Sequence, residues 1–381
     1  MTQRFPPENL PSRLLATLPD CARHGTKIIT NMGAANPRVA AEKACAIVAE
    51  LGLSLKVAAV TGDDVSDLIA DFTLDETGEA AGSLGARLVS ANAYIGISGI
   101  VEALSAGADI IICGRASDPA LFLAPLVHHF GWAMDDYEKL GRGTLIGHLL
   151  ECSAQITGGY FADPGVKDVP DLAHIGFPFA EVTADGNATI SKLPNTGGIV
   201  TPATCTEQLL YEIHDPAWYL QPDVVADFSR VTFESVGTDR VAVCGATGQP
   251  PTGKLKVSVA HRDGWQGEGQ ISYAGVNAHA RAELARSILD QRLTVPGIEE
   301  RLGQLIGSDD HLRLRYTARC DSTTTAHMVG EEVEALYLCG PAAGGGVTKS
   351  IREIIAIAST LIASDSVVLR AEILETNHEV A

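Results

Sequence analysis

Several residues whose side chains could do chemistry follow the segment Ala108 to Cys113. This segment is short and almost wholly apolar, and Gly114 ends it, so we expect a buried strand of a parallel sheet covered on both faces. Arg115 and Asp118 would then stand at the carboxyl end of that strand, where open α/β sheets hold their ligands. Arg115 is suited to anchor a carboxylate through a bidentate pair, and Asp118 to cap a helix that begins at Pro119.

A second group of reactive side chains lies on one predicted helix, Thr144 to Ile156. At 100° per residue, His148, Cys152 and Gln155 share one stripe, with Glu151 at its margin. This pattern predicts the wall of a catalytic or binding site, in which His148 or Glu151 is the general base. The same pattern also fits a solvated helix face that carries one capped core histidine.

The spacing of His148 and Cys152 is also that of zinc-ligand pairs on helices, and Glu151 lies close enough to join them. The sequence offers no second helix with matching His or Cys ligands, so we expect a site that requires no metal and no other cofactor. In that site Glu151 or Asp118 orients His148 as general base, and Cys152 is a further catalytic candidate. An oxygen-rich magnesium or manganese site stays open as an alternative.

Polar residues also follow the other predicted strands of the first half. Because the carboxyl ends of parallel strands lie at one edge of a sheet, we expect these polar residues to contribute to substrate binding. The asparagines and aspartates among them are also ordinary turn and cap residues, so no single strand end identifies a site. The candidates are Asn31, Asn36, Asp63, Asp64, Asn92 and Tyr94, together with Arg115 and Gln155.

Glycine-rich turns form a third group of candidates. A predicted strand at 334–339, the loop Gly340 to Gly346 and a predicted helix at 347–362 have the arrangement of an anion site at a helix N-terminus. Two T-G-G turns could bring backbone amides to the same ligand, although tight turns need the same residues. The glycines singled out are Gly158, Gly159, Gly197, Gly198, Gly344 and Gly345.

The elements that position these residues predict an α/β fold. Strands near 26–31, 56–61, 88–92 and 108–113 alternate with helices near 37–51 and 100–106, which is typical of a parallel, Rossmann-like sheet. We assign residues 1–157 to this domain and 158–381 to an α+β domain with antiparallel strands. The second domain would contain a hairpin at Asp185-Gly186, a helix at 202–213, and strands near 228–236, 240–245, 254–260, 268–274 and 311–319, with a helix at 277–293.

Composition limits the partners. The chain has 381 residues and a formal net charge of −19, which argues against nucleic acid and anionic membranes, since both need a basic surface. A small anionic substrate is compatible with this charge, because a cleft can be locally positive. The N-terminus lacks an apolar signal core and no stretch has 18 uninterrupted apolar residues, so we expect a cytoplasmic protein.

Long blocks of the sequence resemble the acyclic terpene utilisation proteins of the AtuA type. They include TNMGAANP, GADIIICGRASDPALFLAPLVHHFGW and GTLIGHLLECSAQITGGYFADPGVKDV, and the resemblance is continuous from about Thr26 to Val231. Members usually open with a further strand and a Gly-rich turn, and this chain starts after them. The sheet edge left unpaired by that difference leads us to expect a homo-oligomer, most simply a twofold dimer.

The resemblance implies a role in citronellol and geraniol breakdown, where branched chains are degraded as coenzyme A thioesters. We therefore hypothesise a lyase or hydratase that acts on a branched 3-hydroxyacyl-CoA or a related carboxylate, with coenzyme A as part of the substrate. The alternative is a non-catalytic ligand-binding or assembly subunit that works with a partner enzyme. A third hypothesis is an enzyme whose His148, Glu151 and Cys152 hold a metal.

Overall fold

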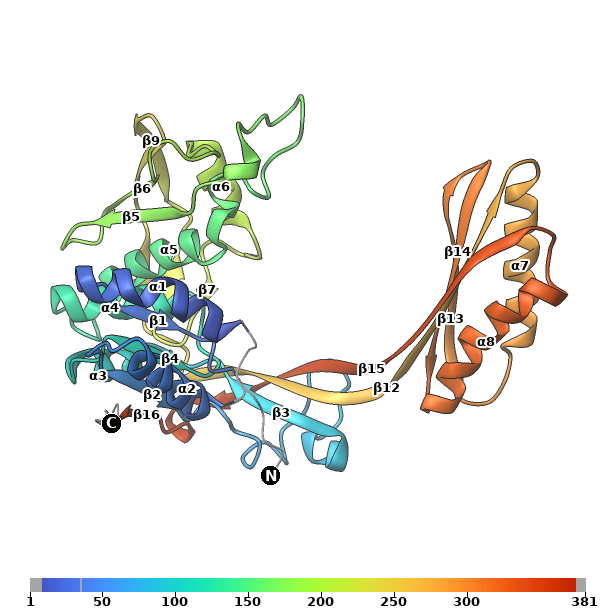
Figure 1. The fold of residues 1–381 in the computed structure, drawn as a ribbon. Helices are drawn as coiled ribbons and strands as arrows, with labels where there is room; N and C mark the ends of the chain where they lie inside the picture. Colours follow the sequence, from blue (N-terminus) through green and yellow to red (C-terminus); the bar gives the residue numbers. More distant parts are fainter. Residues whose placement is uncertain (1–8, 35, 375–381) are drawn as a thin grey trace. The chain divides into compact units, whose positions relative to one another are not determined.

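The computed structural model describes residues 9–34 and 36–374 and has a mixed α/β architecture with parallel and antiparallel sheets (Figure 1). Two compact units are present. The first takes Met1–Ala81, Ser90–Ser258 and Ser359–Ala381, and the second takes Gly82–Val89 and Val259–Ala358. The division expected between residues 157 and 158 lies inside the first unit.

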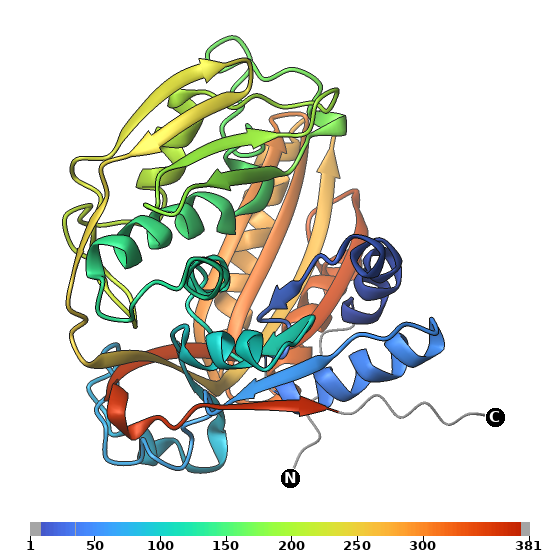
Figure 2. The same ribbon diagram turned by 90° about the vertical axis from the view of Figure 1, so that its left-hand side faces the viewer.

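The first unit contains a four-stranded sheet in the order β1-β4-β2-β16. Strands β1 (Ile28–Thr30), β2 (Val57–Thr61) and β4 (Ile110–Cys113) are parallel, as their positions in the sequence predicted. β16 (Arg370–Leu374) pairs antiparallel with β2 and was not predicted; Figure 2 shows it in red beside the blue β2. β4 lies between β1 and β2, and all four of its residues are buried, which explains its uniformly apolar sequence.

Helices cover both faces of this sheet. Helices α1 (Leu10–His24) and α2 (Pro37–Glu50) share one core with alternate residues of β2 and β4, such as Val57 and Ile110. The intervening residues, such as Ala58 and Ile111, join the core of the opposite face. The helices of that core are α3 (Ser98–Ser105), α4 (Ala120–Phe130) and α5 (Tyr137–Glu151). The period-two alternation of side chains therefore gives β2 and β4 two buried faces.

Antiparallel strands complete the first unit. One sheet has the order β5-β6-β10-β9 and a smaller one the order β11-β8-β7. Their bounds are β5 Pro178–Val182, β6 Ala188–Lys192, β7 Tyr219–Leu220, β8 Val225–Asp227, β9 Thr232–Gly237, β10 Arg240–Cys244 and β11 Thr247–Gln249. The hairpin predicted at Asp185-Gly186 joins β5 to β6, and Gly186 has the positive φ of 86° that such turns require. Helix α6 (Pro202–Leu210) begins with a capping box between Thr201 and Thr204.

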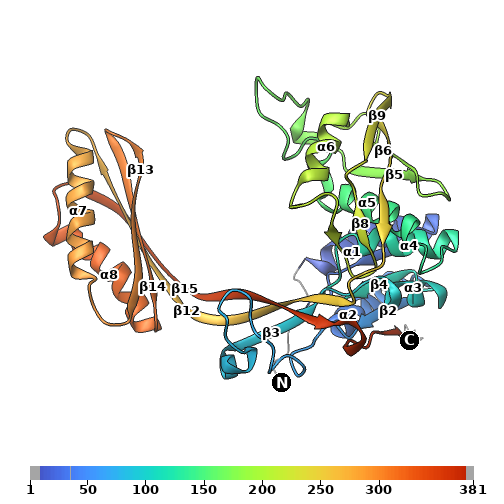
Figure 3. The same cartoon turned by 180° about the vertical axis from the view of Figure 1, so that it is seen from behind.

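The second unit is a sheet with helices packed against it. Its strands are β13 (Ile298–Ser308), β14 (His311–Cys320), most of β12 (Lys254–Ala274) and most of β15 (Gly344–Ala363), in the order β13-β14-β12-β15. Helices α7 (Ala278–Arg292) and α8 (Thr323–Cys339) lie along this sheet, as Figure 3 shows. Their apolar residues form one core with the strands. Short 3₁₀ helices in the chain span Ala81–Arg87, Ser153–Gln155, Leu172–His174 and Ser364–Ser366.

The prediction for residues 334–362 was wrong. The expected strand at 334–339 is the end of α8, which Ser322 caps at its start, and the expected helix at 347–362 is strand β15. The β-branched residues of 347–362 favour a strand, and their alternation was hidden because much of β15 is exposed. Gly344 and Gly345 therefore lie in a strand that follows a helix, and the anion site expected at a helix N-terminus does not exist there.

Three further boundaries differ from those predicted. β3 (Leu88–Ala93) is absent from the parallel sheet and pairs with β12 instead. The strands expected at 254–260 and 268–274 are one continuous strand, β12. The helix expected at 144–156 begins seven residues earlier, at Tyr137, where Asp136 accepts a hydrogen bond from Lys139 N, and it ends at Glu151.

Candidate functional site

Polar side chains gather at the carboxyl end of the parallel sheet, as the sequence predicted. Asn31 follows β1, Asp63 follows β2, and Arg115 and Asp118 follow β4. Asn31 Nδ2 donates a hydrogen bond to Asp118 Oδ1 at 3.0 Å, which joins the tips of β1 and β4. The charges of Asp63 and Asp118 both help burial to raise the pKa of Cys113 to about 12, so two groups of side chains flank the end of β4.

We call the first group the acid–base cluster. Helix α5 carries its central residues, and close packing of α5 on the start of α4 brings them to the tip of β4. At Gly147, a β-carbon would lie 2.7 Å from the Pro119 backbone, so only glycine allows this approach. The cluster consists of Asp118, His148, Glu151, Cys152, Glu212 and Tyr219.

His148 is buried, with 1% of its surface exposed, and both of its ring nitrogens are engaged. Nε2 lies 3.1 Å from the carbonyl oxygen of Leu209, which can only accept, so Nε2 carries a proton. Nδ1 lies 3.2 Å from Glu151 Oε1. Nδ1 and a carboxylate oxygen can hydrogen-bond only through a proton, so this contact places one proton between His148 and Glu151.

Glu151 is the less constrained member of that pair. Burial raises its pKa, and the charges of Asp118 and Glu212 add to the rise, while the hydrogen bond with His148 opposes it. Its second oxygen, Oε2, is buried and has no hydrogen-bond partner among the described residues. A carboxyl group with a raised pKa and a free oxygen is suited to act as a general acid or base near neutral pH.

Two members of the acid–base cluster were missed in the sequence. Glu212 adopts a left-handed backbone with φ 58°, an uncommon conformation for a residue with a β-carbon, which is often found at functional sites. Burial raises the pKa of Tyr219, and the charges of Glu151 and Asp118 raise it further, so the phenol keeps its proton. Neither residue stands in a motif, and only the tertiary fold brings them to α5.

Cys152 and Gln155 lie at and beyond the end of α5. Burial raises the pKa of the Cys152 thiol, which a hydrogen bond with Gln208 opposes, so the thiol is not an activated nucleophile. Gln155 ends the 3₁₀ helix Ser153–Gln155, and its amide N–H donates to the Cys152 carbonyl.

The two T-G-G turns of the first unit pack against each other. Ile199 N donates to Thr157 O, and a β-carbon on Gly198 would lie 2.5 Å from the same oxygen. Gly158 and Gly159 belong to the first of these turns, and Gly197 and Gly198 to the second. Gly198 therefore serves the close contact between the two turns, and Gly197 is likewise held closely against the Asp171 carbonyl. The third glycine run, with Gly344 and Gly345, belongs to β15.

A second group of polar residues surrounds Asp63, which is 2% exposed. Asp63 Oδ2 accepts hydrogen bonds from Asn92 Nδ2 at 2.9 Å and from Arg115 N at 2.7 Å. Burial raises the pKa of Asp63, and these two donors limit the rise. Arg115 in turn donates from Nη2 to the hydroxyl oxygen of Tyr94 at 2.6 Å. The fold thus brings four of the predicted residues together.

The remaining strand-tip candidates make local contacts. Asn36 caps α2, since its side chain accepts a hydrogen bond from Val39 N. Asp64 accepts hydrogen bonds from the amide and the hydroxyl of Ser66, in the manner of an Asx turn.

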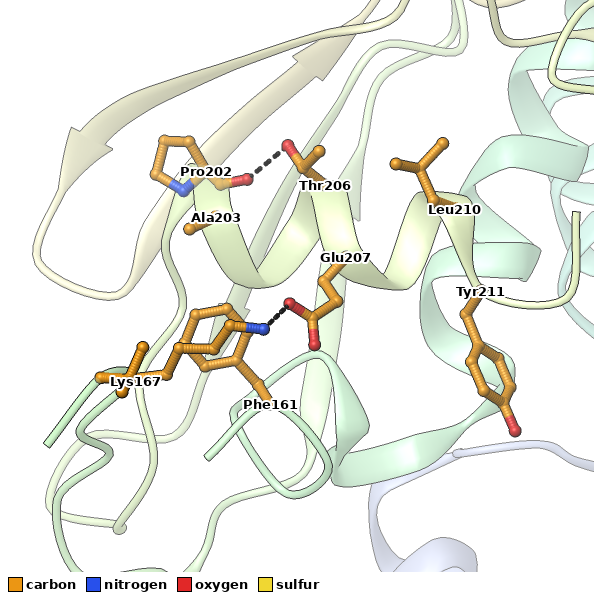
Figure 4. Close-up of a pocket in the computed structure, with 9 residues that line it drawn as sticks. Phe161, Lys167, Pro202, Ala203, Thr206, Glu207, Leu210 and Tyr211 are labelled. Carbon is orange, nitrogen blue, oxygen red and sulfur yellow. Dashed lines mark hydrogen bonds and ion pairs between the residues drawn. The ribbon is translucent and has the colours of Figure 1, made fainter. Parts of the chain in front are cut away.

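An apolar pocket of about 960 Å³ adjoins the acid–base cluster. Figure 4 shows residues of α6, among them Leu210, together with Phe161 and Lys167 from the preceding loop. Tyr211 also lines the pocket, and a hydrogen bond and the negative charge of Glu212 raise its pKa. Glu212 follows Tyr211 in the chain, and its charge also raises the pKa of Glu151, so the pocket and the cluster are adjacent at Glu212.

Within residues 9–34 and 36–374, no group of three or more His, Cys, Asp or Glu side chains is arranged to hold a metal ion. In the same described residues, no helix is long and apolar enough to cross a membrane.

Comparison with known proteins gave one family match. The model of the family described as "Acyclic terpene utilisation family protein AtuA" matches residues 4–373. Among curated proteins, none matches the chain. A crystal structure of a protein from Shewanella oneidensis aligns with a TM-score of 0.20 and 9% identity, over 25% of this chain and 97% of that one. A TM-score this low supports no inference about the fold.

Proposed function

The chain belongs to the AtuA family and takes part in acyclic terpene utilisation, and we propose that it is an enzyme that uses Glu151 as its general acid–base group. The observation that carries the proposal is the buried Glu151–His148 pair, in which one carboxyl oxygen remains free beside Asp118. The contacts favour Glu151 as the titrating group and His148 as the residue that positions it. This reverses the roles expected from the sequence.

His148 is poorly suited to be the base itself. Its Nε2 proton is committed to Leu209 O, and its Nδ1 faces Glu151, so neither nitrogen is available to a substrate without breaking a buried hydrogen bond. Stacking against Phe228, with ring centroids 6.0 Å apart, further fixes the imidazole. His148 can however supply or accept the shared proton, which keeps Glu151 poised for transfer.

The proposed substrate is a branched acyclic terpenoid acid, bound as its coenzyme A thioester. The apolar pocket beside Glu212 would hold the hydrocarbon chain, since Leu210 and Phe161 offer it apolar surface. The reacting carbon would then lie toward the acid–base cluster. Membership of the family supports a terpenoid chain in the substrate. The position of the pocket supports an orientation in which this chain lies in the pocket and the reacting carbon lies at the cluster.

The proposed reaction class is a lyase or hydratase reaction at the 3-position. In the lyase reaction a base removes the proton of the 3-hydroxyl, the bond between carbons 2 and 3 breaks, and the resulting enolate takes up a proton. In the hydratase reaction the base takes a proton from water as its oxygen adds to a carbon–carbon double bond, and the neighbouring carbon is protonated. Either reaction needs one group that accepts and returns a proton, and Glu151 has the required environment.

The test is turnover of synthetic 3-hydroxyacyl-CoA thioesters with branched and unbranched chains, followed by mass spectrometry of the products. Glu151→Gln should lower kcat by about 10²- to 10⁴-fold, because the amide cannot exchange a proton. Glu138→Gln is the matched control, since Glu138 lies on the same helix with its side chain 61% exposed. Equal turnover in Glu151→Gln and the control would refute the proposal. Tight binding without turnover in the unmodified protein would favour a ligand-binding subunit.

A further inference from the structure

We propose that Tyr94 and Arg115 form an oxyanion-binding site at the end of β4, where they bind a carboxylate or phosphate group of the substrate. The site consists of a phenol hydroxyl and a guanidinium group that already contact each other. Arg115 Nη2 donates to Tyr94 Oη at 2.6 Å, and Arg115 Cζ lies 4.3 Å from the centroid of the Tyr94 ring. The guanidinium is thereby held in place before any ligand binds.

Backbone hydrogen bonds from three segments fix both residues. Tyr94 N donates to Lys256 O at 2.8 Å, which joins the end of β3 to the start of β12. Ile95 N donates to Arg115 O at 3.1 Å, and Arg115 N donates to the buried carboxylate of Asp63 at 2.7 Å. Gly114 has no room for a β-carbon, which would lie 2.1 Å from Asp63 Oδ1. The site is therefore preorganised by the tip of the sheet.

Most of the donors of this site have no acceptor among the contacts of the described residues, apart from the one bond from Arg115 Nη2 to Tyr94 Oη. No carboxylate among the described residues forms an ion pair with Arg115, whereas arginines such as Arg23, Arg262 and Arg319 each have one. The Tyr94 oxygen accepts from Arg115 and, at 3.5 Å, from Ser258 Oγ, and its own proton has no acceptor among the contacts of the described residues. A hydroxyl proton and several guanidinium protons are thus free to bind an oxyanion.

The surrounding charges strengthen the phenol as a donor. Lys256 Nζ lies 5.7 Å from the centroid of the Tyr94 ring and adds a second positive charge. Burial alone would raise the pKa of Tyr94, but the hydrogen bonds from Ser258 and Arg115 and the two cations outweigh it, so the pKa is lowered. A more acidic phenol donates a stronger hydrogen bond to an anion.

The ligand chemistry is that of an oxyanion, and two parts of a coenzyme A thioester or dicarboxylic acid could supply it. One is a carboxylate of the acyl group and the other is a phosphate of coenzyme A. Identification of this oxyanion as part of a substrate rests on the proposed function, whereas binding of an oxyanion does not. A binding experiment therefore distinguishes failure of this site from failure of the acid–base proposal.

The experiment is calorimetric titration of the full chain with glutarate, inorganic phosphate and coenzyme A. Tyr94→Phe removes the hydroxyl and keeps the ring under Arg115, and Arg115→Lys keeps the charge but loses the planar fork. Each variant should bind the recognised oxyanion about tenfold or more weakly. Lys43→Gln on α2 is the control for a change of charge, because Lys43 is exposed and should leave binding unchanged. Circular dichroism of each variant checks that it is folded.

A second readout follows Tyr94 itself. Ultraviolet difference titration should show one tyrosine that ionises below the others, and this component should be absent in Tyr94→Phe. Saturation with the bound oxyanion should move this component to higher pH, since an adjacent negative charge disfavours the phenolate.

Binding of glutarate alone identifies an acyl carboxylate, and binding of phosphate and coenzyme A alone identifies the nucleotide part. The inference is overturned if none of the three binds at millimolar concentration, or if both variants bind as well as the control.

Discussion

Asp223 provides a quantitative test of how the loop between β7 and β8 stabilises the first unit. Both of its carboxylate oxygens lie 3.1 Å from Ile97 N, at the start of α3. A β-carbon on Gly96 would lie 2.3 Å from Asp223 Oδ1, so the backbone at Gly96 approaches the carboxylate closely. Burial raises the pKa of Asp223 from 3.8 to about 6, and the bond from Ile97 N only partly opposes this rise.

The sign of the stability effect follows from that shift. Because the pKa is higher in the folded state, the folded state holds the proton more tightly, and the contribution of Asp223 to stability is complete below its unfolded pKa. The contribution is lost as pH rises through about 6. A shift of about 2 pKa units corresponds to about 3 kcal/mol of unfolding free energy.

Asp223→Asn removes this loss, since the amide stays neutral and its oxygen can still accept from Ile97 N. Between about pH 4 and about pH 7, the stability of the variant relative to the unmodified protein should therefore rise by about 2 kcal/mol. The value is below 3 kcal/mol because Asp223 is already partly ionised in the unfolded chain at the lower pH. Urea unfolding at a series of pH values measures the difference directly.

Asp185→Asn serves as the comparison with the opposite sign. Hydrogen bonds from Thr183 and Asn187 lower the pKa of the exposed Asp185, so its contribution is present above its unfolded pKa and is lost as pH falls. The stability of that variant relative to the unmodified protein should therefore change little between the same two pH values, and should rise as pH falls below the unfolded pKa of 3.8. A constant difference for Asp223→Asn across this range would show that the carboxylate is not buried as described, and the reasoning would fail.

Three other outcomes test the site and its assembly. Gly147→Ala should destabilise the protein by about 1–3 kcal/mol in urea unfolding, because its β-carbon would meet the Pro119 backbone at 2.7 Å, and an unchanged midpoint would contradict the close contact of α5 with α4. Leu210→Ser should weaken binding of 3,7-dimethyloctanoate about tenfold in calorimetry while leaving stability nearly unchanged, since Leu210 is 53% exposed; equal affinity would remove the pocket from substrate binding. Light scattering should find a dimer at micromolar concentration, because β1 has only one strand neighbour among the described residues, and a monomer would refute this.

The sequence predicted the part of the fold in which local pattern and tertiary environment agree. β4 reads as a buried strand because both of its faces are covered, and the polar residues after it lie where parallel strands end. The turn at Asp185-Gly186 depends on a backbone conformation that glycine supplies, so it too could be found locally.

The prediction of a loop and a helix at 340–362 failed for the opposite reason. Glycines and an apolar run there fit both a loop before a helix and a strand after one, and only pairing of β15 with β12 decides between them.

The same distinction explains which functional candidates could be found. His148 and Glu151 are three residues apart on one helix, so their contact follows from helical geometry alone. Glu212, Tyr219 and Lys256 reach the site from loops and strands far along the chain, and no spacing in the sequence marks them. Their effect is nevertheless large, because the charge of Glu212 helps to raise the pKa of Glu151 and that of Lys256 helps to lower the pKa of Tyr94. Local sequence pattern thus located Glu151 and Tyr94. The charged residues that shift the pKa values of these two groups reach them only through long-range packing.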